Sequence, residues 1–378
     1  MVVLLVDALG FELATRTPGF MPALDQRRRL DTVLGFSSGA LPTLFSGRRP
    51  VDHGRFLMYR RRTGTSAFRG FGALRLLPRR LRCGPRLAPW LSRVVERRGV
   101  AGYFNLYDVP RELLPEFDLP ERADVFAPGG LPVDSLWDAL ERRGVAWQGR
   151  NWRTHEEDNL AWLEREAAGG ENAFLFVYTA ALDAVLHVEG GAGPGVASAL
   201  ARYQACVARL LQQAEARREE LWVYLLSDHG MVDVHATEDV MGRLATLPFR
   251  WPRDYLAFFD STFARFWWRC DGARDAVRAA LAGARGRWLD DATLEKEGVR
   301  FPDRAYGEDL FLLDPGVLLV PSFMGARPLA AMHGYDPHHP DMAALLWSNR
   351  PIPDSVRHLT DVRAHLEAEL GALAGSAA

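Results

Sequence analysis

The chain has few cysteines and almost no lysine, and it lacks any long apolar run. Its cysteines, Cys83, Cys206 and Cys270, are odd in number, far apart and without the spacing of metal ligands, so no disulfide framework is expected. No segment approaches the roughly 20 apolar residues of a membrane span, which predicts that no transmembrane segment is present. The first residues also lack the basic start of a signal peptide. We therefore expect a cytoplasmic protein in a reducing compartment.

The overall charge gives no sign of a polyanionic partner. The 378 residues carry a formal net charge of -2, and arginine supplies nearly all of the positive charge because Lys296 is the one lysine. A chain of this balance is not expected to bind nucleic acid through bulk electrostatics. Hydrophobic residues make up 48% and charged residues 25%, which excludes the disordered and fibrous classes and predicts a large hydrophobic core.

Short apolar runs alternate with helical segments along the chain. Val2–Val6, Phe174–Tyr178 and 221–226 are almost wholly apolar, as expected for strands that are buried on both faces. Helical patterns over 156–168 and 196–219 precede the second and third of these runs. This alternation predicts an α/β fold with a central, mostly parallel sheet.

Two segments interrupt that pattern. Residues 56–132 are rich in Arg, Pro and Gly and lack clean periodicity, so we interpret them as a cap insertion. A second mixed segment, about 237–310, contains the aromatic run 263–268, which is more typical of a buried strand than of a stacking surface, and a helical stretch over 273–284. A return strand is expected over 311–321. These boundaries leave 1–55 and 133–378 as the core, with 237–310 inserted within it.

Three acids follow the three predicted strands. Asp7, Asp183 and Asp228 would all lie beyond the carboxyl ends of parallel strands, which is where ligands bind in such sheets. Carboxylates gathered at one rim repel one another unless a cation lies among them. Their placement is the first indication of a metal site.

Histidines accompany two of these acids. Asp183 and His187 are four residues apart, so they share one face of a helix, although a surface or capping pair is the commoner reason for this spacing. Asp228-His229-Gly230 offers two adjacent ligands beside a glycine that permits close approach, while a capped turn explains it equally well. His333 is the best candidate among the histidines that remain near the C-terminus, and His338 and His339 are expected in an exposed turn. Together with one serine these residues supply seven ligands, one fewer than two four-coordinate cations need. The remaining position would be filled by water or a phosphate oxygen.

The order of these motifs resembles the alkaline phosphatase superfamily, and within it the type I phosphodiesterase and nucleotide pyrophosphatase branch. The matching elements are Asp7, the run Thr43-x-x-Ser-Gly-x-x-Pro-x-x-His-Gly54, Asp183-x-x-x-His187, Ser227-Asp-His-Gly-Met231 and His333-Gly-Tyr-Asp336. They span nearly the whole chain, and their joint order is far more specific than any one of them. The resemblance implies an alkaline-phosphatase-like sandwich: a mostly parallel sheet flanked by helices, plus cap insertions.

The resemblance also implies the roles of these residues. The family's nucleophile lies sixteen residues before the histidine of the His-Gly pair, which selects Ser37 over Ser38, and His53 itself is expected to shape the loop. One divalent cation, zinc or else manganese, would be held by Asp7, Ser37, Asp228 and His229, and a second by Asp183, His187 and His333. A small phosphorylated substrate, a phosphodiester or nucleotide pyrophosphate, would then be cleaved through a phosphoseryl intermediate on Ser37.

Two departures from the family pattern leave alternatives open. Met58 stands where the family has a phosphate-binding asparagine, so the donors would be Tyr59, Arg60 or Arg61, although a solvated arginine face explains that basic run equally well. A serine in place of the usual threonine favours a phosphomonoesterase, and a cofactor-independent phosphomutase shares the metal set. The sulfatase branch is excluded, because Ser37-Ser-Gly-Ala-Leu41 lacks its modifiable motif. A catalytically silent, metal-bound binding protein is the alternative from another class.

Overall fold

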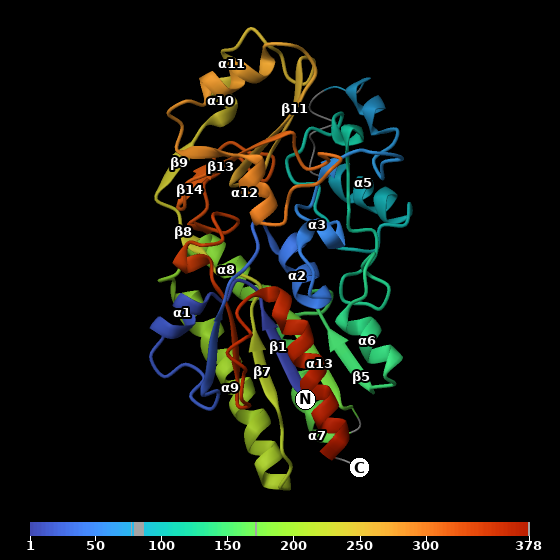
Figure 1. The fold of residues 1–378 in the computed structure, drawn as a ribbon, viewed down its shortest axis with the longest axis vertical. Helices are drawn as coiled ribbons and strands as arrows, with labels where there is room; N and C mark the ends of the chain where they lie inside the picture. The colour runs from blue at the N-terminus through green and yellow to red at the C-terminus, as the bar shows by residue number, and fades with distance from the viewer. Residues whose placement is uncertain (77, 79–86, 171, 377–378) are drawn as a thin grey trace. The chain divides into compact units, whose positions relative to one another are not determined.

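The computed structural model describes residues 1–76, 78, 87–170 and 172–376, and it divides the chain into two compact units (Figure 1). Unit 1 comprises Met1–Arg49, Phe126–Asp233 and Ala330–Ala378, and unit 2 comprises Pro50–Val125 and Val234–Leu329. These limits differ from the predicted ones, because the segments predicted as separate insertions over 56–132 and 237–310 belong largely to one unit. Residues 77 and 79–86, which include Cys83, lie outside the described residues. Of the other cysteines, Cys206 is buried and Cys270 is exposed, and both are free thiols.

Unit 1 is built on a six-stranded, mostly parallel sheet. The apolar run Val2–Val6 forms its central strand β1, which pairs in parallel with a strand on each side. A further parallel strand extends one edge, while an antiparallel strand and the edge strand beyond it extend the other. In spatial order the strands are β2 (Gln26–Leu30), β16 (Ala344–Ser348), β7 (Val223–Leu226), β1, β6 (Phe174–Thr179) and β5 (Trp147–Arg150).

Helices cover both faces of this sheet (Figure 1). Val2, Leu4 and Val6 face a hydrophobic cluster built with α7 (Glu156–Gly169), α8 (Ala181–Glu189) and α9 (Pro194–Arg217). The alternate residues face the opposite way, since successive side chains of a strand point to opposite faces. There Phe176 of β6 meets Phe45 and Trp137, with ring centroids 5.7 and 4.9 Å apart. That face is covered by α2 (Ser37–Ser46), α6 (Leu136–Arg142) and α13 (Leu359–Ser376).

Short elements complete unit 1 around the carboxyl ends of the parallel strands. The two-residue strands β8 and β15 pair with each other in antiparallel fashion. These elements are α1 (Phe11–Arg16), β8 (Val232–Asp233), β15 (Ala331–Met332) and η3 (Pro340–Met342).

Unit 2 has a core of its own around a four-stranded antiparallel sheet, β10-β11-β13-β12. The aromatic run Phe263–Trp268 is the central strand β11, so it is a buried strand, as predicted. The other strands of this sheet are β10 (Tyr255–Phe259), β12 (Gly286–Leu289) and β13 (Asp309–Leu313). The remaining elements are α3 (Pro50–His53), β3 (Arg60–Arg61), η1 (Phe71–Leu76), α5 (Leu87–Glu96), η2 (Leu114–Glu116), β4 (Phe117–Asp118), β9 (Ala236–Glu238), α10 (Val240–Ala245), α11 (Ala273–Ala280), α12 (Asp291–Lys296) and β14 (Val317–Leu319).

The structure confirms the α/β class and the three buried strands, and it corrects the expected return strand. The segment 311–321 does not form one strand, because the turn that includes Gly316 separates β13 from β14. β13 belongs to the antiparallel sheet of unit 2 and β14 pairs in parallel with β9. The late strand that enters the central sheet is β16 instead.

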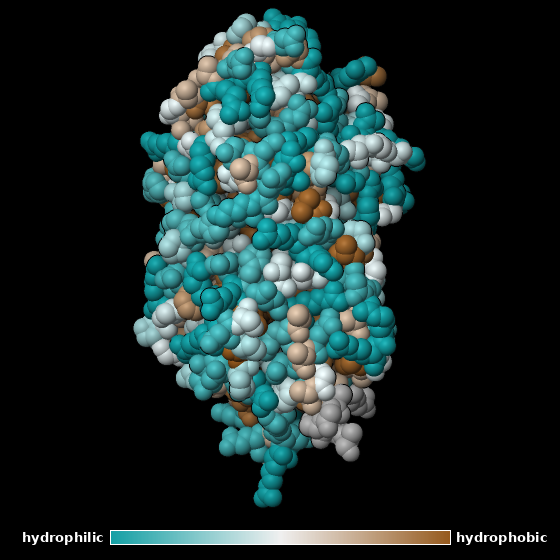
Figure 2. All heavy atoms as spheres, in the orientation of Figure 1, coloured by the Kyte–Doolittle hydropathy of each residue, from teal (hydrophilic) through white to brown (hydrophobic). Residues whose placement is uncertain are grey.

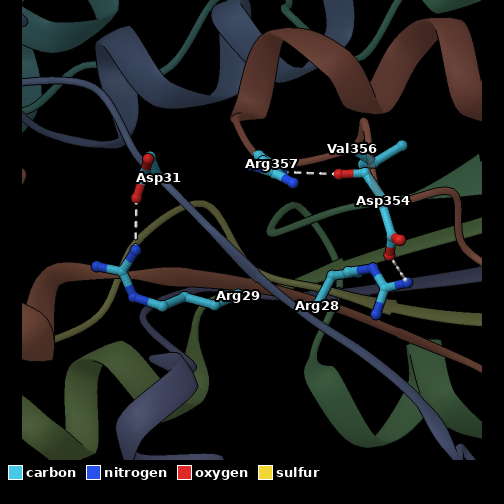
Figure 3. A pocket seen from close by; sticks show the side chains of 6 residues that line it. All are labelled: Arg28, Arg29, Asp31, Asp354, Val356 and Arg357. Atoms are coloured by element: carbon cyan, nitrogen blue, oxygen red, sulfur yellow. Dashed lines mark hydrogen bonds and ion pairs between the residues drawn. The ribbon is translucent and has the colours of Figure 1, made fainter.

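The surface is mainly hydrophilic on the face shown in Figure 2, with hydrophobic side chains scattered singly. No helix in the described part of the chain is both long and apolar enough to cross a bilayer. A hollow of about 320 Å³ lies beside β2 (Figure 3). In its wall Arg28 donates to Asp354 and Arg29 to Asp31, so its charges are largely compensated. Its lining contains none of the predicted site residues.

Candidate metal centre and nucleophile

The predicted ligands all lie in unit 1, and most of them follow its parallel strands. Asp7 directly follows β1, and Asp228 comes two residues after β7. Asp183 lies in the first turn of α8, which begins just after β6, and His187 follows one turn later. His333 directly follows β15. Because β1, β6 and β7 run in parallel, their ends deliver these side chains to the same rim.

The structure brings the six side chains together in two groups. Asp7, Asp228 and His229 form one group and are all buried. The other group consists of Asp183, His187 and His333. Within each group the candidate ligand atoms lie within 4.8 Å of one another. These are the sets that the family resemblance implies for two cations, and metal binding by them stays a prediction.

The two groups adjoin each other. The ring of His229, from the first group, stacks on that of His333, from the second, with centroids 4.0 Å apart. The ring centroid of His187 is 5.3 Å from that of His333. Phe36 meets His333 edge-on at 5.3 Å, which fixes the plane of the central ring. The arrangement suits a pair of neighbouring cations.

Ser37 lies beside the first group. It is the first residue of α2, and its Oγ lies 2.9 Å from Nε2 of His229 and 3.5 Å from Oδ1 of Asp7. The helix therefore starts at Ser37 and continues through Pro42, even though a proline inside a helix removes one backbone hydrogen bond. Peptide N–H groups at a helix start carry partial positive charge, which favours a phosphate beside Ser37.

The local sequence around Asp228 explains why it is held so firmly. Its Oδ1 accepts from the backbone N–H groups of Ala8 (3.4 Å) and His229 (3.1 Å), and its carbonyl accepts from the hydroxyl of Thr32 at 2.7 Å. Gly230 allows the following turn to pass close to a neighbouring segment, because a Cβ there would lie only 2.0 Å from the carbonyl oxygen of Asp341. Any larger residue would push the Asp-His pair out of place.

Two of the imidazoles are oriented by backbone carbonyls. Nδ1 of His187 lies 2.9 Å from the carbonyl oxygen of Ala331, and Nδ1 of His229 lies 3.0 Å from that of Gly230. Such contacts place the proton on Nδ1 and leave Nε2 as a lone-pair donor, an arrangement typical of metal-binding histidines. Burial alone would lower the pKa of His187, but the neighbouring Asp183 outweighs it and raises that pKa.

Several buried polar atoms in these groups have no hydrogen-bond partner among the described residues: Oδ1 of Asp183, Oδ2 of Asp228 and Nδ1 of His333. Oδ1 of Asp183 faces Nε2 of His187 at 3.3 Å and Nε2 of His333 at 3.5 Å without a hydrogen bond to either. Buried atoms of this kind cost free energy unless something compensates them.

The electrostatics of Asp7 point the same way. Burial raises its pKa well above the usual range, and the neighbouring Asp228 and Asp183 raise it further. These acids can remain ionised together only if positive charge lies among them. Carboxylates and neutral imidazoles are donors that suit zinc, and carboxylates also suit manganese. The residues present therefore fit two divalent cations.

The predicted phosphate donors lie in unit 2. Tyr59 is fully buried in the core of that unit, where its hydroxyl donates to the carbonyl of Asn105 at 2.7 Å. Arg60 and Arg61 form β3 and are half-buried, and a guanidinium nitrogen of Arg61 lies 3.5 Å from Glu308. The packing of Tyr59 gives its side chain a structural role within unit 2, while substrate binding by the two arginines stays a prediction.

The other histidines have distinct surroundings. His53 is buried at the end of α3 and its Nδ1 accepts from the backbone N–H of Arg55, as suits a residue that shapes a loop. His338 is exposed, and His339 is half-buried, with its Nδ1 accepting from the backbone N–H of Asp341 at the start of η3.

Sequence reasoning missed two residues that contact the ligands. Thr32 holds the backbone of Asp228, as described above, and Tyr178 donates a hydrogen bond from its hydroxyl to Oδ2 of Asp7. Tyr178 carries a polar group near the end of β6, after four apolar residues of that strand. That break in the pattern was the signal available in the sequence.

Comparisons with known proteins show the family and the fold of the chain. A family described as type I phosphodiesterase / nucleotide pyrophosphatase matches residues 1–251. Human ectonucleotide pyrophosphatase / phosphodiesterase 5 has a similar fold, with a TM-score of 0.67 and 13% identity over 98% of this chain and 94% of that one. Its murine counterpart gives a TM-score of 0.66 at 15% identity, with 98% and 95% covered. An inactive threonine-to-alanine variant of the murine protein, in complex with AMP, gives 0.65 at 15% identity, with 98% and 94% covered. No curated protein sequence matches the chain.

Proposed function

Because the chain belongs to the type I phosphodiesterase / nucleotide pyrophosphatase family and is a phosphoric ester hydrolase, we propose that it cleaves phosphodiester or nucleotide pyrophosphate bonds by attack of Ser37. The observation that carries this proposal is the position of the Ser37 hydroxyl, 2.9 Å from His229 and beside Asp7 at the start of a helix. A serine needs activation to act as a nucleophile, and a group of metal ligands around it is one means of providing that activation.

Two divalent cations, zinc or manganese, are proposed as the cofactors. Asp7, Asp228 and His229 would hold the first together with Ser37, and Asp183, His187 and His333 the second. When bound, such cations lower the pKa of a hydroxyl and neutralise charge on the phosphoryl oxygens. The residues of the chain supply the nucleophile and orient the phosphoryl group.

Ser37 is proposed to form a bond from Oγ to phosphorus while the bond from phosphorus to the leaving oxygen breaks. The N-terminal peptide groups of α2 would orient the phosphoryl group for in-line attack. Water then cleaves the phosphoseryl ester, which releases phosphate or a phosphomonoester and restores the hydroxyl. The rigid stack of His229 on His333 would keep the two halves of the site in register during both steps.

The substrate class rests on the family and on one of the related structures. The murine relative of similar fold was solved with AMP in an inactive threonine variant. A nucleotide of that kind is accordingly our proposal for the product side of the reaction. The serine in this chain keeps a hydroxyl nucleophile available, while it leaves phosphomonoester hydrolysis as the competing activity.

The experiment compares bis-p-nitrophenyl phosphate with p-nitrophenyl phosphate as substrates, in chelator and with added zinc or manganese. We expect turnover only with metal, and a higher kcat/KM for the diester. A preference for the monoester would replace the diesterase proposal with a phosphomonoesterase. Metal-loaded protein that turns over neither substrate would favour a binding protein without catalytic activity.

A further inference from the structure

The two oxygens of Asp7 have different surroundings. Oδ1 faces the site, at 3.5 Å from both the Ser37 hydroxyl and Nε2 of His229. Oδ2 accepts a hydrogen bond from the hydroxyl of Tyr178. One oxygen of the carboxylate therefore lies beside the predicted nucleophile and ligand, and the other is bound by the phenol.

The backbone fixes this relationship. Tyr178 lies opposite Leu5 in the parallel register of β6 and β1, and the N–H of Asp7 donates to the carbonyl of Thr179 at 2.9 Å. The Tyr178 ring packs against Phe126, with centroids 5.0 Å apart. The strand pairing therefore fixes the backbones of Tyr178 and Asp7, and the contact with Phe126 fixes the Tyr178 ring. The hydrogen bond between the two side chains has a defined direction as a result.

Asp228 shows the same division by different means. Its Oδ1 accepts from two backbone N–H groups, whereas its Oδ2 has no hydrogen-bond partner within the described residues. At Asp7 the donor to Oδ2 is the phenol of Tyr178 instead of a backbone N–H group. Each carboxylate of the first group thus presents one oxygen to the site and has the other one anchored.

We propose that Tyr178 is a positioning residue, which anchors Oδ2 of Asp7 so that this carboxylate binds its cation through Oδ1 alone. The inference rests on the proposed function, because it takes the first group to be a metal site. A charge-assisted hydrogen bond between a phenol and a carboxylate is strong and directional, so its loss allows the carboxylate to rotate. Partners of metal ligands contribute about 10- to 100-fold to metal affinity or activity in known sites.

Tyr178→Phe is the test, because it removes the hydroxyl and keeps the ring. Tyr203→Phe is the matched control: Tyr203 is also buried in unit 1, and its hydroxyl donates to Glu156 at 2.6 Å, outside both ligand groups. Cation affinity is measured by titration of the chelator-treated protein with Mn²⁺ and with Zn²⁺. We expect the affinity of the first group to fall by about 10- to 100-fold in Tyr178→Phe and to stay within about threefold of wild type in Tyr203→Phe.

Kinetics provide a second readout. With saturating metal, Tyr178→Phe should lower kcat for the diester while KM stays within about threefold of the wild-type value, because the phenol does not face the substrate side of Asp7. In an Asp7→Asn background the same substitution should leave cation affinity unchanged, since no carboxylate remains to be anchored. In the Asp7→Asn background, removal of the Tyr178 hydroxyl leaves no buried carboxylate at position 7 without a hydrogen-bond donor. Misfolding caused by such a carboxylate therefore cannot account for the result in that background.

The outcomes distinguish failure of the role proposed for Tyr178 from failure of the proposed function. If the wild-type protein binds two cations and turns over substrate but Tyr178→Phe matches the Tyr203→Phe control in affinity, the role of Tyr178 is overturned. An equal loss in the wild-type and Asp7→Asn backgrounds overturns it as well, because the effect would then not pass through Asp7. If wild-type protein binds no cation at these residues, the proposed function itself fails.

Discussion

His229 and His333 stack face to face, with centroids 4.0 Å apart and ring planes only 14° apart, although they belong to different ligand groups. Burial lowers the pKa of His333 well below its usual value, and the nearby His229 and His187 lower it further. A neutral imidazole is the form that binds metal. The stack therefore joins the two halves of the centre through rings that are ready to act as ligands.

Replacement of His333 tests the second cation. His333→Ala should reduce the metal content from two ions to one per chain and lower diester hydrolysis by at least about 100-fold, or about 3 kcal/mol in activation free energy. Metal analysis of the purified protein and steady-state kinetics measure both effects. His338→Ala is the control, because His338 is exposed in the same loop, and it should keep both ions. Two ions retained in His333→Ala would remove this residue from the ligand set.

Ser37→Ala tests the choice of nucleophile. Turnover should fall by about 1000-fold or more, because the attacking oxygen is lost, whereas the unfolding midpoint should barely change at this half-buried position. Acid quenching of wild-type enzyme with substrate, followed by mass spectrometry, should find the phosphoryl group on this residue. Ser38→Ala is the matched variant next in sequence and should stay active. Inactivity of Ser38→Ala together with activity of Ser37→Ala would exchange their roles.

Asp7→Asn should have opposite effects on stability with and without metal. In chelator the substitution removes a buried charge beside Asp228 and Asp183, so the free energy of unfolding should rise by about 1–3 kcal/mol. With saturating zinc the order should reverse, because the wild-type protein gains more binding energy. Thermal unfolding under both conditions measures the two values. A variant that is less stable under both conditions would contradict the predicted repulsion.

His53 should make unit 2 less stable at acid pH. Burial lowers the pKa of His53 to about 3, and the nearby Arg55 contributes. The histidine is therefore neutral in the folded chain, whereas the unfolded chain takes up a proton below pH 6.5. Stability should be fully present above that pH and fall as the pH drops toward 3, by at most about 1.4 kcal/mol per pH unit from this group.

Urea unfolding at pH 7 and pH 4.5, followed in wild type and His53→Gln, isolates that contribution. Other groups titrate in both proteins, so the difference between the two slopes is the quantity of interest. The variant should lose less stability between the two pH values. Equal losses would show that His53 does not titrate as its burial requires.

Arg265 supports the core of unit 2 through a buried ion pair. Its Nε donates to Asp260 at 2.7 Å and its Nη1 donates to the carbonyl of Tyr59, at the start of the basic run. Arg265→Met should lower the free energy of unfolding by about 3–5 kcal/mol, because Asp260 is left buried without its partner. Arg269→Met, which removes a half-exposed pair with Glu116, should cost much less. Denaturant midpoints measured side by side decide between the two.

The central sheet could be predicted because its strands are buried on both faces. A short, wholly apolar run such as Val2–Val6 has few possible structures other than a buried strand. The acid that follows it marks the rim of the sheet. The ligand groups followed from that rim together with the order of the motifs. Their members lie far apart in sequence, so without that order no single motif favoured metal over a turn or a cap.

Unit 2 was harder to predict, because several of its strands pair with partners that lie far away in the sequence. Tyr59 illustrates the difficulty. The arginines that follow it suggested a phosphate donor, whereas its ring packs against Phe68 and Phe258. Pairing of β9 with β14 joins residues about 80 positions apart, which local patterns do not specify. Apolar residues also lie on both sides of Asp314-Pro315-Gly316, and the expectation of one strand over 311–321 overlooked that these three residues are typical of a turn.

The centre draws on all three segments of unit 1, which has a consequence for its assembly during synthesis. The first ligand group and Ser37 are complete once the chain has reached His229, but the second group waits for His333, beyond the whole of unit 2. The strand β16, which fills the place between β7 and β2, arrives later still. A ribosome-bound or truncated chain can therefore contain the nucleophile while the second ligand group is still incomplete. Hydrolysis is then expected only after the last segment of unit 1 has joined the sheet.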